Sequence, residues 1–565
     1  MPLVAVTQRG LAASHRSSGG NFFIQPSLSA MSDFSFAYCG GAGKLRRPVE
    51  TSTGATDDFP PEPHRMKPNI LLITADQWRG DCLSAIGHPT VRTPNIDALA
   101  REGVLFRRHY AGTAPCSPAR ATLYTGLYQA NHRVCQNGSP LDDRFDNLAL
   151  ASRRAGYDPT LFGYTDVSPD PRSVDPHDPV LTSYEGVLPG FTVGQILLEH
   201  EKQWLSWLRS KGRTGALARD VHRTEHLGAP PAYSSDETQT AFLTDAFLAW
   251  REIQDRPWFA HISFLRPHPP FCVPEPYASM FAPGDGPAYA RAADRQDEAD
   301  VHPFLRFAMS SQQKSSFVLG AEGPVSDWTA ADIDRIRATY YGMIAEVDAQ
   351  FGRIVSALRD GGDWDKTIIV FTSDHAEMMG DHWSLGKGGY HDGSYHIPLV
   401  IRDPAAIAAA GRQVDAFTSA ADIMPTLCER LGLMPRNHQD GRSLLPFVTG
   451  HEPERWRDAA FFEFDFRDVV NATREAQFGL RSNECNLSVL RDEAFKYVHF
   501  GGMPPLLFDL KADPMELRNV AEDPAFLAVR LLYAEKLLAL RAAHLDQTLA
   551  FTELTAEGPV SRPTV

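Results

Sequence analysis

Short, uninterrupted apolar segments that end in polar side chains restrict the fold of this chain more than any other feature. Residues 69–75 form one such segment and lead directly into Asp76-Gln77, and residues 367–373 form another that leads into Asp374-His375. An apolar run of this length, without polar alternation, is typical of a strand that is buried on both faces of a sheet. Both segments are therefore predicted to be central strands.

Two further segments follow the same pattern. Residues 258–265 lead into Arg266-Pro267-His268, and a shorter run near 160–162 leads into Gly163-Tyr164. Because ligands of parallel sheets bind beyond the carboxyl ends of the strands, the polar residues that follow all four segments are expected to meet in one site.

Helical patterns separate these strands, for example at 93–102 and at 333–358. Alternating strands and helices predict an α/β fold with a mainly parallel central sheet and helices on both faces. After about Gly450 the pattern changes to short strand-like segments, which predict a small C-terminal antiparallel sheet; they are 477–481, 487–490, 496–500 and 507–510. A helix is expected from Pro524 to Ala543, and the polar tail after Thr548 is expected to extend over a neighbour or over the domain surface.

These patterns divide the chain into three parts. Residues 1–65 have few acidic groups, many prolines and glycines and no hydrophobic periodicity, so we expect a disordered extension. A targeting segment, or a misassigned start with the true start at Met66, is the alternative. Residues 66–450 are predicted to form the catalytic α/β domain, and residues 451–565 a C-terminal α+β subdomain with an extended tail.

Composition excludes several classes of function. The 565 residues carry a formal net charge of −15, which argues against binding to nucleic acid or to an anionic membrane surface. No segment is long and apolar enough to predict a membrane span. The seven cysteines are scattered and form no C-x-x-C pair, which suits a reducing compartment without disulfides and argues against a thiolate zinc site. We therefore expect a cytoplasmic protein.

The run C-S-P-A-R that begins at Cys116 predicts a local structure that chemistry can use. Ser117 is suited to cap a helix, Pro118 to its first position, and Gly126 to its left-handed end. Cys116 is thus predicted to precede a helix N-terminus, where free N–H groups favour an anion. Arg120, one turn further on, can hold the side chain of residue 116 by hydrogen bonds. Taken alone, such a cysteine would more often be a small buried core residue.

This pentad resembles the sulfatase signature, in which the cysteine is oxidised after translation to formylglycine. The resemblance covers most of residues 66–400, because further motifs occur in sulfatase order: Asp76-Gln77, Gly163-Tyr164, Arg266-Pro267-His268, Ser373-Asp374-His375 and Gly386-Lys387. Gly441-Arg442-Ser443-Leu444 and Asp513-Pro514-Met515-Glu516 also look like that family. Gln77 and His375 make the chain most similar to the phosphonate monoester hydrolases and their arylsulfatase relatives, within the alkaline phosphatase superfamily.

The resemblance implies a role for individual residues. The metal ligands would be Asp76, Gln77, Asp374, His375 and the diol derived from Cys116, and hard oxygens with one imidazole suit a single divalent cation such as Ca²⁺ or Mn²⁺. The remaining roles would be orientation of the diol by Arg120, contact with substrate or nucleophile by Asn137 and Tyr164, and binding of the ester oxygens with assistance to the leaving group by His268 and Lys387. One hydroxyl of the diol would attack the sulfate or phosphorus centre, and the other would then expel the bound anion by elimination.

The chain departs from the expected pattern at Asp166, where the resemblance to phosphonate monoester hydrolases predicts threonine. A carboxylate there would repel a bound anion unless Lys387 or His268 paired with it.

The function expected from these residues is formylglycine-dependent, metal-assisted hydrolysis of sulfate monoesters, phosphonate monoesters or both. A phosphate mono- or diesterase of the same superfamily and a non-catalytic binding protein with the sulfatase fold are the alternatives. The expected partners are a small anionic ester, a formylglycine-generating enzyme and further copies of this chain.

Overall fold

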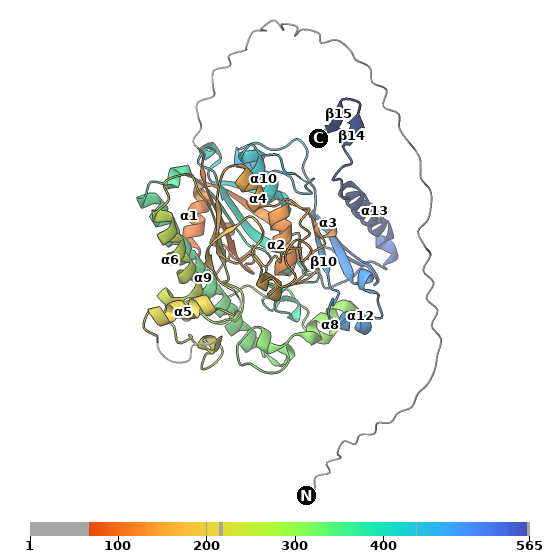
Figure 1. Cartoon of the computed structure of the whole chain (residues 1–565). Coiled ribbons are helices and arrows are strands. Elements are labelled where there is room, and N and C mark those ends of the chain that lie inside the picture. The colour runs from red at the N-terminus through yellow and green to blue at the C-terminus, as the bar shows by residue number, and fades with distance from the viewer. Residues whose placement is uncertain (1–66, 199, 214–218, 437, 562–565) are drawn as a thin grey trace, which may run out of the picture. The chain divides into compact units, whose positions relative to one another are not determined.

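An eight-stranded sheet is the centre of the computed structural model, which describes residues 67–198, 200–213, 219–436 and 438–561 (Figure 1). The extension expected at residues 1–65 lies outside these described residues. Across the sheet, the strands are β5 (Thr192–Ile196), β4 (Pro159–Gly163), β6 (Phe259–Phe264), β1 (Asn69–Ala75), β7 (Thr367–Thr372), β8 (His396–Arg402), β2 (Val104–Tyr110) and β9 (Arg412–Ser419). The four strands expected from the sequence are neighbours in the sheet, in the order β4, β6, β1, β7.

The sheet is mainly parallel, as the sequence predicts. Strand β1 pairs in parallel with β6 on one side and with β7 on the other, so that Ile70 lies beside Phe259 and Ile368. Strand β8 is antiparallel to both β7 and β2. The carboxyl ends of β4, β6, β1 and β7 therefore lie along one edge.

Both faces of the sheet are covered, which explains why its strands are apolar throughout. Leu71 and Ile73 of β1 pack into one core, whereas Ile70 and Leu72 pack into the other. Helices with side chains in the first core are α1 (Pro94–Glu102), α5 (Lys202–Ser210), α6 (Gln239–Glu252) and α9 (Ala330–Asp360). Those with side chains in the second are α2 (Cys116–Thr125), α4 (Leu148–Arg154), α10 (Ile423–Arg430) and α11 (Leu445–Val448).

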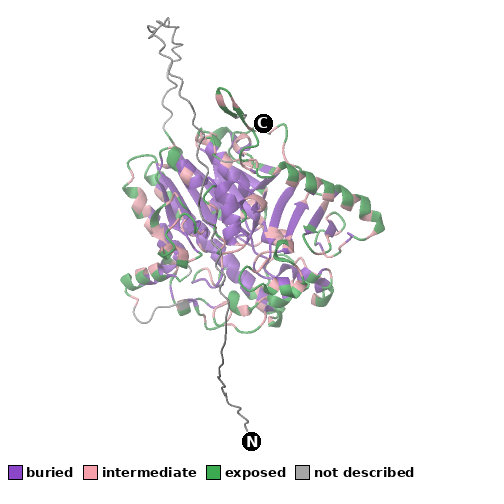
Figure 2. Cartoon of the chain, turned by 45° about the vertical axis from the view of Figure 1, so that its right-hand side comes forward, coloured by how far each residue is buried: buried purple, intermediate pink, exposed green. Residues whose placement is uncertain are grey.

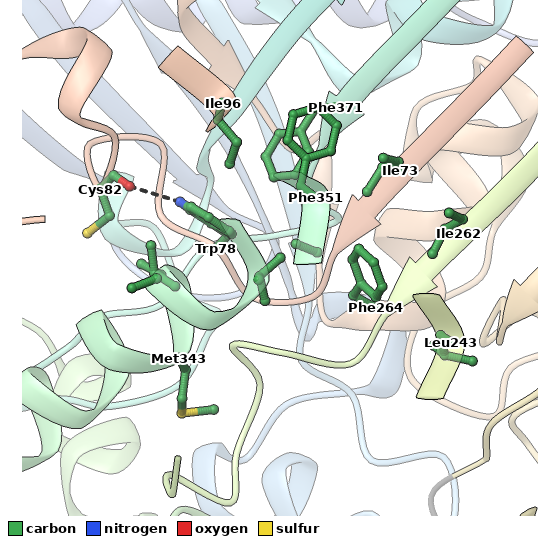
Figure 3. Packing of buried hydrophobic residues seen from close by; sticks show 14 of the residues in the cluster. Ile73, Trp78, Cys82, Ile96, Leu243, Ile262, Phe264, Met343, Phe351 and Phe371 are labelled. Atoms are coloured by element: carbon green, nitrogen blue, oxygen red, sulfur yellow. Dashed lines mark hydrogen bonds between the residues drawn. The ribbon is translucent and has the colours of Figure 1, made fainter. Parts of the chain in front are cut away.

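The first core is dense with large rings close to the site. Trp78, two residues after Asp76, meets Phe371 edge to face with ring centroids 5.4 Å apart, and its Nε1 donates a hydrogen bond to the carbonyl oxygen of Cys82 over 3.0 Å (Figure 3). Phe351 of α9 packs on the same Phe371 ring. The loop that follows β1 is therefore anchored by apolar contact, which fixes where Asp76 points.

A second, five-stranded sheet has the order β13 (Leu506–Asp509), β12 (Phe495–Phe500), β11 (Asn486–Arg491), β10 (Ala460–Asp465) and β3 (Thr113–Ala114). Strands β10 to β13 are antiparallel neighbours, but β3 pairs in parallel with β10. Phe462 faces the main domain, while Phe461 faces helix α13 (Leu527–Ala543), whose outer side is largely exposed (Figure 2). Because β3 directly precedes Cys116, the small sheet helps to fix the start of helix α2.

One of the expected C-terminal strands is wrong. Residues 477–481 contribute to helix α12 (Thr473–Phe478), which ends at Gly479 with a left-handed φ of 66°. Gly479 instead caps a short helix whose Phe478 ring packs against Phe307. The predicted segments at 487–490, 496–500 and 507–510 are strands β11, β12 and β13.

The remaining elements connect these layers. They are the helices α3 (Gln129–His132), α7 (Arg295–Ala299) and α8 (Pro303–Ser311) and a terminal hairpin of β14 (Thr552–Thr555) and β15 (Gly558–Ser561). The polar tail thus forms a hairpin within its described residues. Among the helices of the described residues, none is both long enough and apolar enough to cross a bilayer.

Candidate functional site

The polar residues that follow β1, β4 and β6 line one cavity, as the topology predicts, and those that follow β7 lie against Asp76 and Cys116 of its lining. Its empty volume is about 520 Å³. Of the residues singled out in the sequence, the cavity is lined by Asp76, Cys116, Asn137, Tyr164, Asp166 and His268. Cys116 comes from the N-terminus of α2, and the others come from the ends of β1, β4 and β6 and from the loop after α3.

Helix α2 begins earlier than the sequence suggests. Cys116 is its first residue and Pro115 its N-cap, so Ser117 does not cap the helix, and its hydroxyl oxygen has no hydrogen-bond partner in the described residues. The backbone N–H of Ser117 instead donates to Oδ1 of Asn137 over 3.0 Å. The helix ends at Gly126 with a φ of 70°, as expected. Asn137 thus supplies the capping oxygen and links its loop to the residue after Cys116.

Four side chains form a buried cluster that can hold a metal ion. Ligand atoms of Asp76, Cys116, Asp374 and His375 all lie within 4.8 Å of one another. Within the cluster, Cys116 Sγ lies 3.2 Å from Nε2 of His375. The sequence predicted these four residues as ligands, and the fold brings them together from β1, α2 and β7.

Two details of the cluster fit a cation. Oδ1 of Asp76 is buried without a hydrogen-bond partner in the described residues. The other ring nitrogen of His375, Nδ1, lies 3.2 Å from the carbonyl oxygen of Ala376, so donation to this oxygen leaves the Nε2 lone pair facing the carboxylates. Nε2 lies 3.7 Å from oxygens of both Asp76 and Asp374. A divalent cation would satisfy both the orphaned oxygen and this lone pair.

Arg120 is completely buried and holds the acidic ligands rather than the cysteine. Its Nε donates to Oδ2 of Asp374 over 2.9 Å, and its Nη2 donates to Oδ2 of Asp76 over 3.2 Å. Nη1 donates to Oγ of Ser263 over 2.8 Å. Among the described residues, none of its hydrogen bonds goes to Cys116, in contrast to the geometry suggested from the pentad. Arg120 therefore neutralises and orients two carboxylates in a site sealed from water.

Gln77 and Lys387 are joined by a hydrogen bond. Nζ of Lys387 donates to Oε1 of Gln77 over 2.7 Å, and the amide nitrogen of Gln77 donates to Glu377. Burial works to lower the pKa of Lys387, but neighbouring acidic groups, Asp76 and Asp374 among them, raise it overall, so the amine is a cation at neutral pH. In this arrangement Gln77 positions the ammonium group, and its part in binding metal stays a prediction.

Glu377 is a further residue of the site, which the sequence pattern did not predict. This carboxylate is buried, accepts the Gln77 amide, and also accepts the backbone N–H groups of Met379 (3.1 Å) and Gly386 (2.5 Å). It therefore ties the loop after β7 to the loop that carries Lys387. The sequence signal that could have identified Glu377 is its acidic side chain three positions after Asp374, in a buried loop.

His268 and Tyr164 lie in the cavity as predicted. Burial and the charge of Lys387 lower the pKa of His268 to about 3, and its Nδ1 lies 2.8 Å from the carbonyl oxygen of Pro269. An ester anion beside this ring would raise the pKa again. The hydroxyl of Tyr164 donates to Asp76, and the Arg120 guanidinium stacks on its ring at 4.3 Å from the centroid.

Two backbone positions beside Tyr164 have a positive φ. Gly163 has a φ of 119°, and a Cβ there would lie only 2.2 Å from the carbonyl oxygen of Ser263, so glycine is required where β4 meets β6.

Asp166 has a φ of 52°, a conformation that aspartate tolerates better than β-branched residues. Burial, reinforced by Asp76 and Asp374 against the opposing effect of Arg120, raises the pKa of Asp166 to about 7.

Cys116 itself is a poor nucleophile as a thiol. Burial, together with the negative charge of Asp76, raises its pKa well above the usual range for cysteine. A thiolate is the reactive form of cysteine, and this environment disfavours it. The site surrounds residue 116 with cation-binding oxygens, which suits a neutral or metal-bound oxygen nucleophile better than sulfur.

Two family models match this chain. Residues 68–433 match the family model described as Sulfatase, and residues 380–543 match the model described as N-sulphoglucosamine sulphohydrolase, C-terminal. The first match contains all ten residues proposed for the site. The second contains the small sheet apart from β3.

Individual proteins are similar over nearly the whole described chain. The multifunctional alkaline phosphatase superfamily protein PehA of Trinickia caryophylli is 41% identical over 508 residues, which cover 87% of this chain and 99% of PehA. The crystal structure of the phosphonate monoester hydrolase of Agrobacterium radiobacter is 68% identical with a TM-score of 0.87, covering 88% of this chain and 100% of that one. The phosphonate monoester hydrolase from Silicibacter pomeroyi is 39% identical with a TM-score of 0.83, covering 88% of this chain and 99% of that one.

Proposed function

The chain belongs to the sulfatase family and is a hydrolase of ester bonds, and on this premise we propose that it cleaves phosphonate and sulfate monoesters with a formylglycine made from Cys116. The observation that carries the proposal is the buried cluster of Asp76, Cys116, Asp374 and His375 at the N-terminus of α2. The cluster supports the proposal because residue 116 would lie beside the bound cation, in surroundings that suppress thiolate chemistry.

We propose one divalent cation, Ca²⁺ or Mn²⁺, bound by Asp76, Asp374, His375 and the modified residue 116, with Gln77 as a further oxygen ligand. The orphaned Oδ1 of Asp76 and the two carboxylates of the cluster support this choice. When bound, the cation would act as a Lewis acid and lower the pKa of the hydroxyl that it contacts.

The chain's own residues would prepare the site for an anionic ester. Arg120 offsets the charge of two carboxylates and fixes their oxygens. Lys387, held by Gln77, supplies a cation for the ester oxygens. His268, kept neutral by burial, can take up a proton as an anion approaches and return it to the departing alcohol. Asn137 holds the start of α2 in place beside residue 116.

Phosphonate monoesters are the first substrates to test, because two similar structures are described as phosphonate monoester hydrolases, one of them 68% identical to this chain. Sulfate monoesters follow, because an arylsulfatase of Clostridium perfringens is 28% identical over 488 residues. A metal phosphatase without the modification is less well supported, since it would need serine or threonine where this chain has Cys116. A non-catalytic role is disfavoured by the complete set of charged residues in the cavity.

The test combines peptide mass spectrometry with kinetics. Protein co-produced with a formylglycine-generating enzyme should show conversion of Cys116 and should hydrolyse p-nitrophenyl phenylphosphonate and p-nitrophenyl sulfate. Protein produced without conversion should bind metal but turn over neither ester. Equal multiple turnover by unconverted protein would refute the role of formylglycine, and inactivity of the converted, metal-loaded protein on both esters would refute the substrate assignment.

A further inference from the structure

A second cleft adjoins the active site at Lys387 and is separate from the cavity that contains Cys116. Its empty volume, open solvent included, is about 830 Å³. Two stretches of chain run from the active site into its wall, one from His375 to Met378 and the other from Lys387 to His391. The N–H of Met378 donates to the carbonyl oxygen of Gly386 over 2.8 Å, which holds the two stretches together. The cleft is thus built from the same loops as the site.

Four phenylalanine rings contribute to the lining of this cleft. Phe304 and Phe307 come from α8, and Phe464 and Phe466 come from the end of β10. The Phe304 ring lies 5.0 Å from that of Phe466 and 6.2 Å from that of Phe464, centroid to centroid. Phe307 and Phe464 are only half-buried, so part of their ring surface remains available. Such a wall fits a flat aromatic ligand, because stacked and edge-to-face contacts add to the gain from burial.

Buried polar groups in the wall lack partners. The hydroxyl of Tyr390 has no hydrogen bond within the described residues, and neither ring nitrogen of His391 has one. Nδ1 of His391 approaches Oε2 of Glu516 at 3.4 Å, but without hydrogen-bond geometry. Both side chains are more than nine-tenths buried and line the cleft. Unsatisfied groups of this kind need a partner, which a polar ligand atom would provide.

Two cations line the cleft without an acidic partner. Lys387 donates to Gln77, and Nη1 of Arg474 donates to the carbonyl oxygens of Phe466 (3.2 Å) and Arg467 (3.3 Å). No carboxylate of the described residues forms an ion pair with either Lys387 or Arg474. The anionic ester group is expected to pair with Lys387. The positive charge of Arg474 is then available to a second anionic group of the ligand.

We propose that this cleft binds the alcohol portion of the substrate, and that the preferred alcohol is a flat aromatic one with a second anionic group, such as a carboxylate, that pairs with Arg474. The proposal rests on the proposed function, since it assumes that the ester lies beside Lys387. The cavity around Cys116 suits such a group less well, because three acidic side chains line it: Asp166, Glu185 and Glu201, the last of which pairs with His222.

Kinetics with matched leaving groups test the proposal. The converted, metal-loaded enzyme would be assayed with phenylphosphonate monoesters of 4-carboxyphenol and 4-carbamoylphenol, and with the corresponding 6-substituted 2-naphthols. Each pair differs in charge, and because the amide withdraws electrons more than the carboxylate, leaving-group ability alone would favour the neutral ester. We expect kcat/KM to favour the carboxylate by at least about fivefold for one ring size or both. Arg474→Gln should abolish that preference, and Arg474→Lys should retain part of it.

Arg481→Gln provides the matched control. Arg481 lies on the same subdomain but pairs with Glu484 at the surface and does not line the cleft, so its loss should leave the preference unchanged. An equal loss in both variants would mean a general charge effect and would overturn the proposal. Preference for a cationic 4-aminomethylphenyl ester would also overturn it, because the alcohol would then lie toward Glu185 and Glu201.

Binding of the product alcohol separates this proposal from the proposed function. Fluorescence titration with 6-hydroxy-2-naphthoate and with 6-hydroxy-2-naphthamide needs no turnover. Tighter binding of the carboxylate by the wild type but not by Arg474→Gln would support the cleft even if every ester proved inert. Turnover of the esters with no charge preference, and with equal binding of both alcohols, would leave the hydrolase intact and the cleft assignment wrong.

Discussion

Nε of Arg120 donates a hydrogen bond to Oδ2 of Asp374 over 2.9 Å, and both side chains are completely buried. This contact joins the helix that carries Cys116 to the end of the central strand β7. It explains why the arginine of the pentad serves the acidic cluster rather than the cysteine. Removal of Asp374 would leave Arg120 paired with Asp76 alone, whereas removal of Arg120 would leave two buried carboxylates for a bound cation to offset.

Asp374→Asn should weaken metal binding and activity together. The amide keeps the shape of the side chain but loses the charge that faces His375 and Arg120, so we expect a fall in kcat/KM of more than about 100-fold, with loss of bound metal on dialysis. Elemental analysis and kinetics on the same samples measure both. Asp415→Asn, at an exposed ion pair with Arg107, is the control and should change neither. Full activity of Asp374→Asn without metal would contradict the metal site.

Cys116→Ser should fold normally and retain metal but lose multiple turnover. Serine offers one hydroxyl, so an ester formed on it has no second hydroxyl to expel the anion by elimination. A single burst of p-nitrophenol followed by no further product is the expected time course. Cys116→Ala should show no burst at all. Steady turnover by the serine variant at a rate near that of the converted enzyme would exclude the elimination step.

Gly163→Ala should destabilise the protein by at least about 2 kcal/mol and displace Tyr164. Its φ of 119° is unsuited to alanine, and the new Cβ would lie 2.2 Å from a backbone oxygen of β6. Gly362→Ala is the matched control, since Gly362 has a φ of 70° but no atom near its Cβ position. That variant should lose only about 1 kcal/mol. If urea unfolding shows the same loss in free energy of unfolding for both variants, the clash of the new Cβ with Ser263 is relieved by a small backbone shift.

Much of the catalytic domain could be predicted from the sequence. The continuous apolar character of residues 69–75 and 367–373 reflects burial on both sheet faces, and parallel topology then brings Asp76 and Asp374 to one edge. Periodicity also located α1 and α9 to within a few residues. These features depend on local pattern and on one topological rule, so no long-range information was needed.

What the sequence could not supply depends on contacts between distant segments. The parallel pairing of β3 with β10 joins residues 113–114 to 463–464, and no local pattern signals it. Residues 477–481 formed a helical turn because Gly479 ends it and Phe478 packs against α8. The partners of Arg120 and the place of Glu377 likewise required the folded loops. The three-part domain division stays a prediction.

Glu346→Gln should change how stability depends on pH. Burial raises the pKa of Glu346 to about 7 against the opposing effect of hydrogen bonds from Thr238 and Thr240 and the charge of Arg266. The folded state therefore keeps a proton between pH 4.5 and about 7 that the unfolded chain releases, so the wild type loses stability as pH rises through this window. Glutamine has no proton to lose, and its variant should gain up to about 3 kcal/mol relative to the wild type from pH 5 to pH 8. Urea unfolding at both pH values measures this difference. If the free energy of unfolding changes equally with pH in the two proteins, the pKa of Glu346 lies near its ordinary value.

Substrate charge should decide the preference among esters. Sulfate and phosphonate monoesters carry one negative charge, whereas phosphate monoesters are mostly dianions at neutral pH. Asp166 lines the cavity and is ionised at pH 8.5, above the pKa of about 7 to which burial raises it. It therefore repels the second charge of a phosphate more than the single charge of the other esters. We expect kcat/KM for p-nitrophenyl phenylphosphonate and p-nitrophenyl sulfate to exceed that for p-nitrophenyl phosphate.

Asp166→Asn tests whether this carboxylate is the discriminating group. Asparagine tolerates the φ of 52° at this position, whereas threonine, the residue expected there from the family resemblance, is β-branched and would be strained in this backbone. Loss of the charge should raise kcat/KM for the phosphate ester by about tenfold relative to the phosphonate ester. Asp175→Asn, which removes an exposed charge from the following loop, should leave the ratio unchanged. If Asp166→Asn also leaves it unchanged, the preference is set by Lys387 and the metal ligands alone, and the departure at residue 166 is neutral for charge selection.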